Sequence, residues 1–300
     1  MNEYVSKKKP FGLSSFLLKF IAAFLMTLDH VGLFFFNPGS GAVPQEPYYF
    51  LRAAGKMSFP IFAFLAVESL YHTKHPVRYL LRLGVAAAVL EIAGYLFGLG
   101  SHLVPAQNPV LGNAFTDLFL GVLMLYFLKK KNWWSFFGLV PFALGLLSCL
   151  WINDTYGTLI KTDWSAFGVT LFLFLFLARE GADLYLRREA KRRNLPEEAF
   201  LDVDRLWARK GSESVALIFT GLLYYVLWRL TGSTFFLPGG ASFVPVGTYC
   251  VLAFLFYLLY NGERGYSDKH GILKWIFYLY YPLHLLLLAV LSLFFGVLAA

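Results

Sequence analysis

The chain has 300 residues, of which 58% are hydrophobic, 19% aromatic and only 15% charged. Soluble globular domains carry roughly 25% charged residues, so this composition excludes an ordinary soluble domain and is typical of a protein that crosses a membrane several times. The formal net charge of +8 is spread over short basic runs between apolar segments. Because these runs form no single basic patch, we expect no nucleic-acid partner.

The first apolar segment, residues 17–36, follows three lysines and resembles a secretory signal peptide in that respect. It is nevertheless long enough to cross a bilayer as a helix, and it carries Lys19, Asp29 and His30. The apolar region of a cleaved signal does not normally contain such charges. We therefore interpret the segment as a retained first membrane helix.

Apolar stretches that could cross a bilayer as helices recur along the whole chain. They lie at about 17–36, 57–71, 79–99, 113–128, 133–151, 165–179, 213–230, 244–260 and 273–298. We therefore predict an all-α, polytopic transmembrane bundle of about nine spans, within a range of eight to ten. One integral-membrane domain is expected to occupy residues 1–300.

The connections between these stretches alternate in charge. Basic connections lie at 7–9, 72–78, 129–131, 179–210 and 263–274, and nearly uncharged or mildly acidic ones lie at 99–112, 152–164 and 231–243. Basic loops stay in the cytoplasm, so this alternation predicts a cytoplasmic N-terminus and, with nine spans, a C-terminus outside. We expect a multi-pass membrane protein.

The segment 179–212 is the one connection long and polar enough to be an extramembrane feature, and we predict a cytoplasmic basic helical loop there, interrupted at Pro196. The favoured interpretation is a surface helix held by anionic lipids. The alternative hypothesis is a segment that holds a phosphorylated substrate.

Ionisable side chains inside a membrane span cost free energy, so they normally face the bundle interior and mark functional sites. In the first span, Lys19 and His30 are eleven residues apart and lie within about 20° of the same helical face, about 16 Å apart along the axis. Asp29 is adjacent to His30 in the sequence, and neighbouring side chains on a helix do not face each other, so Asp29 is not expected to bond the His30 ring. A neighbouring helix is expected to supply the side chains that pair with Asp29 and His30.

Later spans carry further charges at helical spacings. Glu68 and His72 are four residues apart, so they are expected to pair on one helical face. Asp117 lies on a stripe of polar and small residues with Asn113 and Gly121. A structural alternative is that Arg82 forms a buried ion pair with Glu91 or Asp117 and fixes the helix register.

Four segments of the chain resemble the TraX family, whose founding activity is N-acetylation of a conjugative pilin subunit. They are "LKFIAAFLMTLDH", "GKMSFPIFAFLAVESLYHTKHPVRYLLRL", "NAFTDLFLGVL" and "FYLYYPLHLLLL". In the family pattern an Arg commonly stands where this chain has Lys56, and a Gly where it has Ser69. TraX-like proteins are similar in turn to the acyltransferase-3 proteins and the lysosomal heparan glucosaminide N-acetyltransferases. Acyltransferase-3 proteins carry an Arg eleven positions before a His, and Lys19 and His30 stand at that spacing here.

The resemblance implies acyl transfer from a cytoplasmic acyl-CoA, which needs a base, an oxyanion donor and a basic site for the phosphates. The expected catalytic residues are His30 as base or nucleophile, Asp29 or Asp117 to orient its imidazole, and Asn113, with Arg82, for the oxyanion. The nucleotide is expected to be held by Lys19, Arg78, Arg82, Lys129 and Lys130. Candidates on the substrate side are Arg52, Lys56, Glu68 and His284. No metal is expected, since Cys149 and Cys250 have no partners at ligand spacing.

The leading hypothesis is thus a membrane acyltransferase that moves an acyl group, most simply acetyl from acetyl-CoA, to an amine or hydroxyl of a protein, glycan or lipid acceptor. The resemblance implies a multi-pass protein of the bacterial inner membrane. The bilayer is the other partner, and an oligomer is compatible with the sequence. One alternative is a proton-coupled transporter in which Asp29, His30, Glu68 and Asp117 relay protons, although the repeated halves typical of transporters are not visible. The other is a non-catalytic membrane scaffold.

Overall fold

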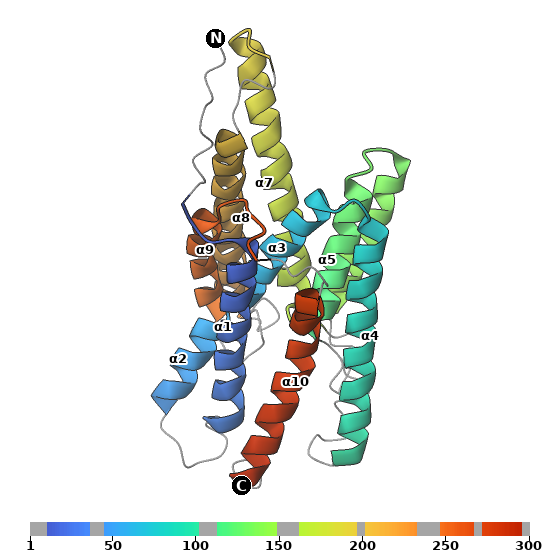
Figure 1. Ribbon diagram of the computed structural model, residues 1–300, viewed down its shortest axis with the longest axis vertical. Coiled ribbons are helices and arrows are strands. Elements are labelled where there is room, and N and C mark those ends of the chain that lie inside the picture. The colour runs from blue at the N-terminus through green and yellow to red at the C-terminus, as the bar shows by residue number, and fades with distance from the viewer. Residues whose placement is uncertain are drawn as a thin grey trace.

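The computed structural model describes residues 11–36, 45–101, 113–148, 162–196, 202–232, 247–266 and 272–295. In these ranges the regular structure is helical, apart from one isolated bridge between Leu13 and Tyr260. The helices are α1 (Ser15–Phe35), α2 (Gln45–Gly55), α3 (Ser58–His72), α4 (Pro76–Ser101), α5 (Ala114–Leu128), η2 (Trp133–Gly138), α6 (Leu139–Leu147), α7 (Ser165–Arg192), α8 (Asp202–Thr231), η6 (Gly247–Ala253), α9 (Phe254–Leu259) and α10 (Ile272–Phe294). The predicted all-α bundle is confirmed (Figure 1).

In the part of the chain that the structure describes, every apolar stretch predicted from the sequence falls on one helix or on two consecutive helices. The predicted positions 149–151, 244–246 and 296–298 lie outside the described residues. Within the described residues, five helical segments are long and apolar enough to cross a membrane: Ser15–Phe35, Glu46–His72, Ser165–Arg192, Asp204–Thr231 and Trp275–Ser292. Shorter apolar helices lie at Ala114–Leu128, Trp133–Leu147 and Gly247–Leu259. The protein is therefore a multi-pass membrane protein, and the count of nine crossings stays a prediction.

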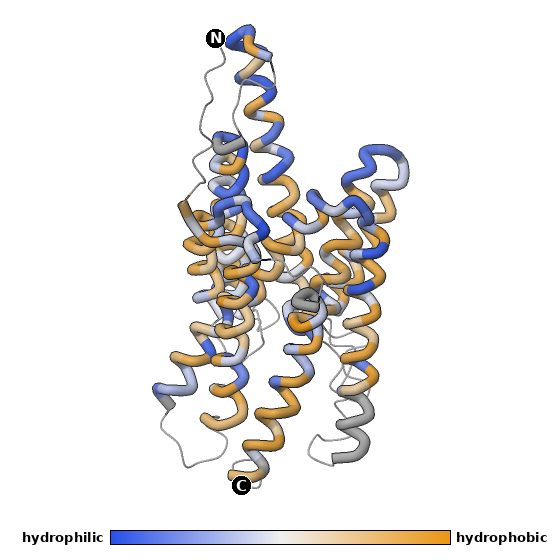
Figure 2. The backbone as a smooth tube through the Cα atoms, in the orientation of Figure 1, coloured by the Kyte–Doolittle hydropathy of each residue, from blue (hydrophilic) through white to orange (hydrophobic). Residues whose placement is uncertain are grey.

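Hydrophilic residues gather toward one end of the bundle. Figure 2 shows them at the end of α7, the start of α8 and the connections α3–α4 and α5–η2, above helices that are mostly hydrophobic. The segment 259–264 lies beside the start of α1, because Leu13 and Ser15 donate backbone hydrogen bonds to Leu259 and Glu263. The described parts of four predicted basic connections thus share one end of the bundle, whereas the fifth, at 7–9, lies outside the described residues. That this end faces the cytoplasm stays a prediction.

The second predicted span begins earlier than the sequence analysis placed it. Residues Gln45–Gly55 form α2, and a short turn at Lys56 and Met57 separates α2 from α3. Pro60 lies in the first turn of α3, where its missing N–H is tolerated. Its carbonyl oxygen accepts a hydrogen bond of 2.7 Å from the Tyr257 hydroxyl, which attaches α3 to α9.

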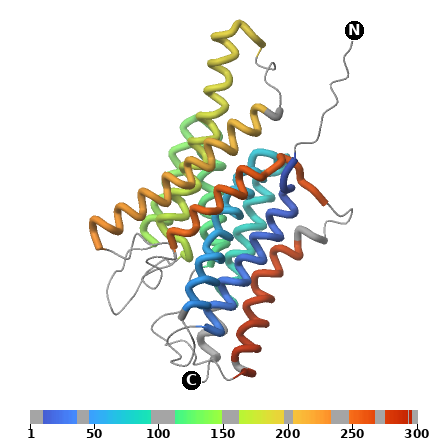
Figure 3. The backbone as a smooth tube through the Cα atoms, turned by 90° about the vertical axis from the view of Figure 1, so that its left-hand side faces the viewer, coloured from blue at the N-terminus to red at the C-terminus, as the bar shows by residue number. Residues whose placement is uncertain are grey.

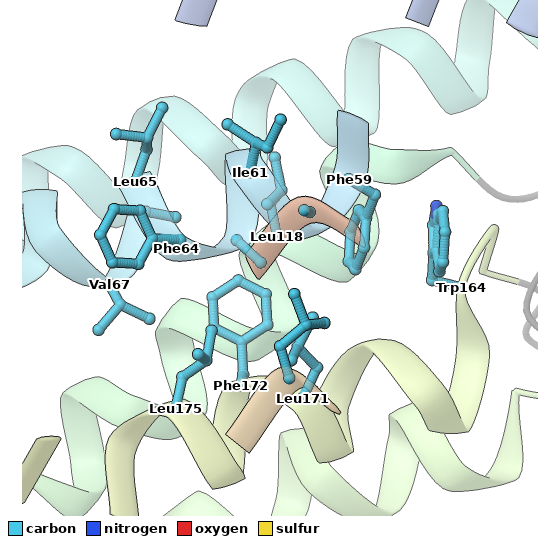
Figure 4. Close-up of a cluster of buried hydrophobic side chains, with 14 of the residues drawn as sticks. Phe59, Ile61, Phe64, Leu65, Val67, Leu118, Trp164, Leu171, Phe172 and Leu175 are labelled. Carbon is cyan, nitrogen blue, oxygen red and sulfur yellow. The ribbon is translucent and has the colours of Figure 1, made fainter. Parts of the chain in front are cut away.

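The main hydrophobic core lies between α3, α5 and α7. In Figure 4, Phe172 and Leu175 of α7 point toward Phe64 and Val67 of α3, and Leu118 of α5 lies beside them. These side chains are at most 7% exposed. Large apolar side chains on the outer face of α10 are exposed instead, including Leu279, Leu283, Leu286, Leu287 and Val290. Exposed apolar faces of this kind suit contact with lipid.

Two glycines allow α7 to approach its neighbours closely. Gly121 of α5 lies against the ring of Phe172, and Gly145 of α6 lies against Val169, so that a Cβ at either position would overlap these side chains. Small residues at such contacts are how membrane helices gain packing without a hydrophobic driving force. Gly121 belongs to the stripe predicted from the sequence, and that stripe does face another helix.

The predicted basic loop at 179–212 is helical at both ends. Its first part is the end of α7 and its last part the start of α8, and the two helices run side by side in opposite directions (Figures 1 and 3). The Arg209 guanidinium donates to both carboxylate oxygens of Asp183, at 2.7 and 2.9 Å. Arg179 is only 1% exposed and belongs to the bundle core. Arg179 is thus a core residue, and the position of the rest of the segment outside the membrane stays a prediction.

Gly121→Ala should destabilise the protein by about 1–3 kcal/mol, because the new methyl group overpacks the contact with Phe172. The matched control is Gly181→Ala in α7, since a Cβ at Gly181 meets no other atom within 4 Å. The control should melt at the wild-type temperature or slightly above it, given the better helix propensity of Ala. Thermal unfolding in detergent measures both. Equal melting temperatures for the two variants would contradict the close contact.

Candidate functional site

A cavity of about 140 Å³ lies between α1, the turn from α2 to α3, α5, the segment 163–164 and α10. We call it the inner cavity. Its polar lining residues are Asp29, His30, Arg52, Lys56, Ser58, Asp163 and Tyr281. The sequence analysis singled out four of these, and the structure places them around one space.

A second, larger cavity of about 550 Å³ begins near the start of α1, and we call it the outer cavity. Four of its lining residues carry basic side chains: Lys19, His72, Arg82 and Arg264. The two cavities have five lining residues in common, namely Met26, Phe62, Ala114, Leu118 and Tyr281. The basic outer cavity and the histidine-containing inner cavity are therefore neighbours that share a wall.

The His30 ring is held by His284 of α10. Nδ1 of His30 lies 3.0 Å from Nε2 of His284, and Nδ1 of His284 lies 2.8 Å from the backbone oxygen of Tyr280. The rings of Tyr280 and His284 are stacked, with centroids 5.1 Å apart and an interplanar angle of 13°. The partner that the sequence analysis expected from a neighbouring helix is thus a second histidine.

Asp29 has different partners from the predicted one. Its carboxylate is paired with the Arg52 guanidinium and lies 3.7 Å from Nζ of Lys56. All three side chains are buried, and the pairing joins α1 to α2 and to the α2–α3 turn. A Cβ at Gly55 would overlap Asp29, so the glycine permits this approach. The acid neutralises two cations here and does not orient His30.

Asp117 also has a different partner from the predicted one. Its fully buried Oδ2 accepts a hydrogen bond of 2.8 Å from the backbone N–H of Trp164. This contact attaches α5 to the start of α7 and holds the adjacent Asp163 at the inner cavity. Asp163 was missed from the sequence, where it lies near the end of the mildly acidic link 152–164. An acid directly before an apolar span was the signal that could have found it.

The Asn113 side chain is occupied by structural contacts. Its Oδ1 caps α5 by accepting from the backbone of Phe115 and Thr116, at 2.9 and 3.1 Å. Its Nδ2 donates to the Ala87 oxygen at 3.3 Å and to Glu91 at 2.7 Å. An amide has two N–H groups, and both are used. This arrangement leaves Asn113 without a donor for an oxyanion, which corrects the role expected from the sequence.

Glu68 forms the predicted contact with His72, at 3.0 Å, and a second one with Arg179, at 2.8 Å. Arg179 also pairs with Glu213 of α8 at 3.1 Å, and its guanidinium lies 4.4 Å from the Tyr71 ring centroid. This buried cluster joins α3, α7 and α8. Glu68 is thus a structural partner of Arg179 that also reaches the outer cavity.

The predicted nucleotide-binding residues separate into two groups. Lys19 and Arg82 line the outer cavity, whereas Arg78 is exposed outside it. Lys129 and Lys130 lie 3.9 and 4.9 Å from the ring centroids of Tyr71 and Tyr126 and are not among the lining residues. Burial, followed by the charge of Arg179, lowers the pKa of Lys129. Arg264, which the sequence analysis did not single out, is a further cation of the outer cavity.

Comparison with known proteins identifies the family. The model of the TraX protein family matches residues 14–190, which is more than half of the chain. The chain belongs to the TraX family. It is 26% identical over 279 residues to a protein of Dichelobacter nodosus named "Probable fimbrial assembly protein FimC, serogroup H1", which covers 92% of this chain and 94% of that protein. No solved structure matches the chain. The wider resemblance to acyltransferase-3 proteins stays a prediction.

The four segments that resemble the TraX family meet at the two cavities. The first, second and fourth supply His30, Lys56 and Tyr281 to the inner cavity, and the third supplies Ala114 and Leu118 to the shared wall. The two positions at which this chain differs from the TraX pattern also lie here. Lys56 lines the inner cavity, and Ser69 lines the outer one. Within the described residues, no three His, Cys, Asp or Glu side chains could hold a metal ion.

Asp29→Asn should destabilise this TraX protein more than Arg52→Met does. Removing the acid leaves two neighbouring buried cations without the carboxylate between them, which should cost about 3 kcal/mol or more. Removing Arg52 leaves Lys56 beside Asp29 and should cost less. Unfolding by SDS in mixed micelles measures the two free energies. An equal or greater loss from Arg52→Met would contradict the sharing of Asp29 between two cations.

Proposed function

We propose that this TraX protein is an acyltransferase of the inner membrane. It transfers an acyl group, most simply acetyl, from cytoplasmic acyl-CoA to an amine or hydroxyl of an acceptor. The observation that carries the proposal is the pair of adjoining cavities, one with a basic lining and the other containing His30, with a common wall. A donor and an acceptor held in the two cavities would meet at that wall.

The outer cavity has the charge that a CoA nucleotide needs. Lys19, Arg82 and Arg264 present three cations from α1, α4 and the segment before α10. Phosphate groups form short, charge-assisted hydrogen bonds with such side chains. The aromatic side chains of Phe16, Tyr266, Phe277 and Tyr278 also line this cavity and provide faces for the adenine and the pantetheine chain. The thioester would then extend toward the shared wall.

His30 is placed to handle the proton of the transfer. In the proposed step, a ring nitrogen of His30 takes the proton from the acceptor's N–H or O–H while the acceptor attacks the thioester carbonyl carbon. The tetrahedral intermediate then collapses, the carbon–sulfur bond breaks, and the CoA thiolate receives the proton from His30. Attack by His30 itself, with an acyl-imidazole as intermediate, uses the same nitrogen lone pair.

The oxyanion is best assigned to Lys56. Asn113 has no free donor, whereas Lys56 lines the inner cavity beside His30 and is only 5% exposed. A cation held in a dry site stabilises developing negative charge much more strongly than it does in water. Lys56 is positioned from two directions, since Nζ lies 3.7 Å from Asp29 and 5.5 Å from the Trp164 ring centroid.

The acceptor is proposed to be a pilus or fimbrial subunit. The name of the Dichelobacter nodosus relative supports this class, as does the activity implied by the family resemblance. The inner cavity lies beyond the outer one from the start of α1, so a membrane-embedded subunit could reach His30 without entering the donor's cavity. A glycan or lipid acceptor fits the same chemistry.

His30→Ala should reduce acetyl-CoA hydrolysis by purified protein at least 100-fold while acetyl-CoA binding persists, since general-base groups contribute about 10²–10⁴-fold to rate. CoA release in detergent, with binding measured separately, tests this. The matched control is His75→Ala, an exposed histidine that lines neither cavity. Folded wild-type protein that binds no acetyl-CoA would overturn the proposed function.

Arg82→Gln should weaken acetyl-CoA binding by about 10-fold, because a hydrogen bond to a charged group contributes roughly 1.5–3 kcal/mol. Arg78→Gln removes the same charge one helical turn away, outside the outer cavity, and should leave the Kd unchanged. Titration of both variants with acetyl-CoA gives the comparison. If the two variants lose the same affinity, the outer cavity is not the nucleotide site.

A further inference from the structure

The hydrogen-bond chain from Tyr280 to His30 fixes where the protons lie on two neutral histidines. A backbone carbonyl oxygen can only accept, so Nδ1 of His284 must carry the hydrogen that bonds the Tyr280 oxygen at 2.8 Å. Nε2 of neutral His284 is then an acceptor. Because it lies 3.0 Å from Nδ1 of His30, His30 must donate from Nδ1. The lone pair of His30 is thereby placed on Nε2.

His284 is rigidly held for this task. His284 is only 6% exposed. Its ring stacks on Tyr280 and forms an edge contact with Tyr281, whose ring centroid is 5.7 Å away. The hydroxyls of Tyr280 and Thr27 lie 2.5 Å apart and attach α10 to α1 within one turn of His30. Neither cavity includes His284 among its lining residues, whereas His30 lines the inner one.

The two acids that the sequence analysis expected to orient His30 are engaged elsewhere. Asp29 pairs with Arg52 and Lys56, and Asp117 accepts from the Trp164 backbone. A carboxylate in the place of His284 would add a further charge inside the membrane, where an unpaired charge costs several kcal/mol. A neutral imidazole can accept the same hydrogen bond without that cost.

We propose that His284 is a positioning residue that holds His30 in the Nδ1–H tautomer and leaves the Nε2 lone pair for the inner cavity. Its catalytic consequence rests on the proposed function, but the tautomer itself does not. When Nε2 of His30 takes the acceptor's proton, the Nδ1–H bond to His284 stabilises the imidazolium that forms. His30 then returns the proton to the leaving thiolate, and His284 keeps its single proton throughout.

The decisive variants are His284→Gln and His284→Asn. The longer Gln side chain can place its oxygen near the position of Nε2 and accept from His30, whereas Asn reaches only to the position of Nδ1. Both are neutral and polar, so they form a matched pair for folding. His284→Leu removes the acceptor altogether. A thermal melt in detergent identifies the variants that are folded.

The first readout is the ¹⁵N spectrum of histidine-labelled protein in bilayers, with the His30 signals assigned by their loss in His30→Ala. Wild type and His284→Gln should show one protonated Nδ1 and one unprotonated Nε2 at His30. His284→Asn and His284→Leu should show a mixture of tautomers. A wild-type His30 that carries its proton on Nε2, or a spectrum unchanged in folded Asn and Leu variants, would overturn the inference.

The second readout is acetyl-CoA hydrolysis. The Asn and Leu variants should lose at least 10-fold in kcat with KM unchanged, and Gln should recover most of the loss, because the donor is bound away from His284. If the tautomer changes as expected but neither the wild type nor any variant hydrolyses acetyl-CoA, the positioning role of His284 stands and the proposed function fails. If all proteins turn over acetyl-CoA equally, the positioning role fails and the proposed function stands.

Discussion

The structure depends on the need to neutralise charge inside an apolar bundle. Two buried clusters do this: Asp29 with Arg52 and Lys56, and Arg179 with Glu68 and Glu213. Each joins segments distant in sequence, and a lone member of either cluster would be strongly unfavourable in the membrane. The clusters therefore fix how α1 meets α2 and how α3 meets α7 and α8. The walls of both cavities follow from these contacts.

This constraint also shapes the chemistry. An acid used as a structural counterion cannot at the same time orient a catalytic imidazole, so the site separates the two tasks. Carboxylates hold cations at the α2–α3 turn, and a neutral histidine from α10 holds His30. The result is a site in which the orienting group adds no charge of its own next to the proposed proton carrier.

From the sequence we could predict contacts between residues at helical spacing, and we could recognise ionisable residues, which are rare in a membrane span. Lys19, His30 and the contact between Glu68 and His72 were found in this way, and so was the α5 stripe. Partners far apart in sequence could not be found: His30 and His284 are separated by 254 residues. Arg179 ends an apolar stretch and was counted with a polar loop, because charge pattern alone does not show that α8 supplies Glu213. The short, polar α2 carries too few apolar residues to signal a membrane helix.

The break between α2 and α3 has an electrostatic consequence. Residues Glu46–His72 have the length and composition of one continuous span, but α3 starts anew at Ser58. A helix carries a partial positive charge at its first turn, from aligned peptide dipoles. Ser58 and Phe59 form that turn and line the inner cavity. The break therefore brings the partial negative end of α2 and the partial positive end of α3 together beside the inner cavity, and both partial charges belong to the backbone, independent of any side chain.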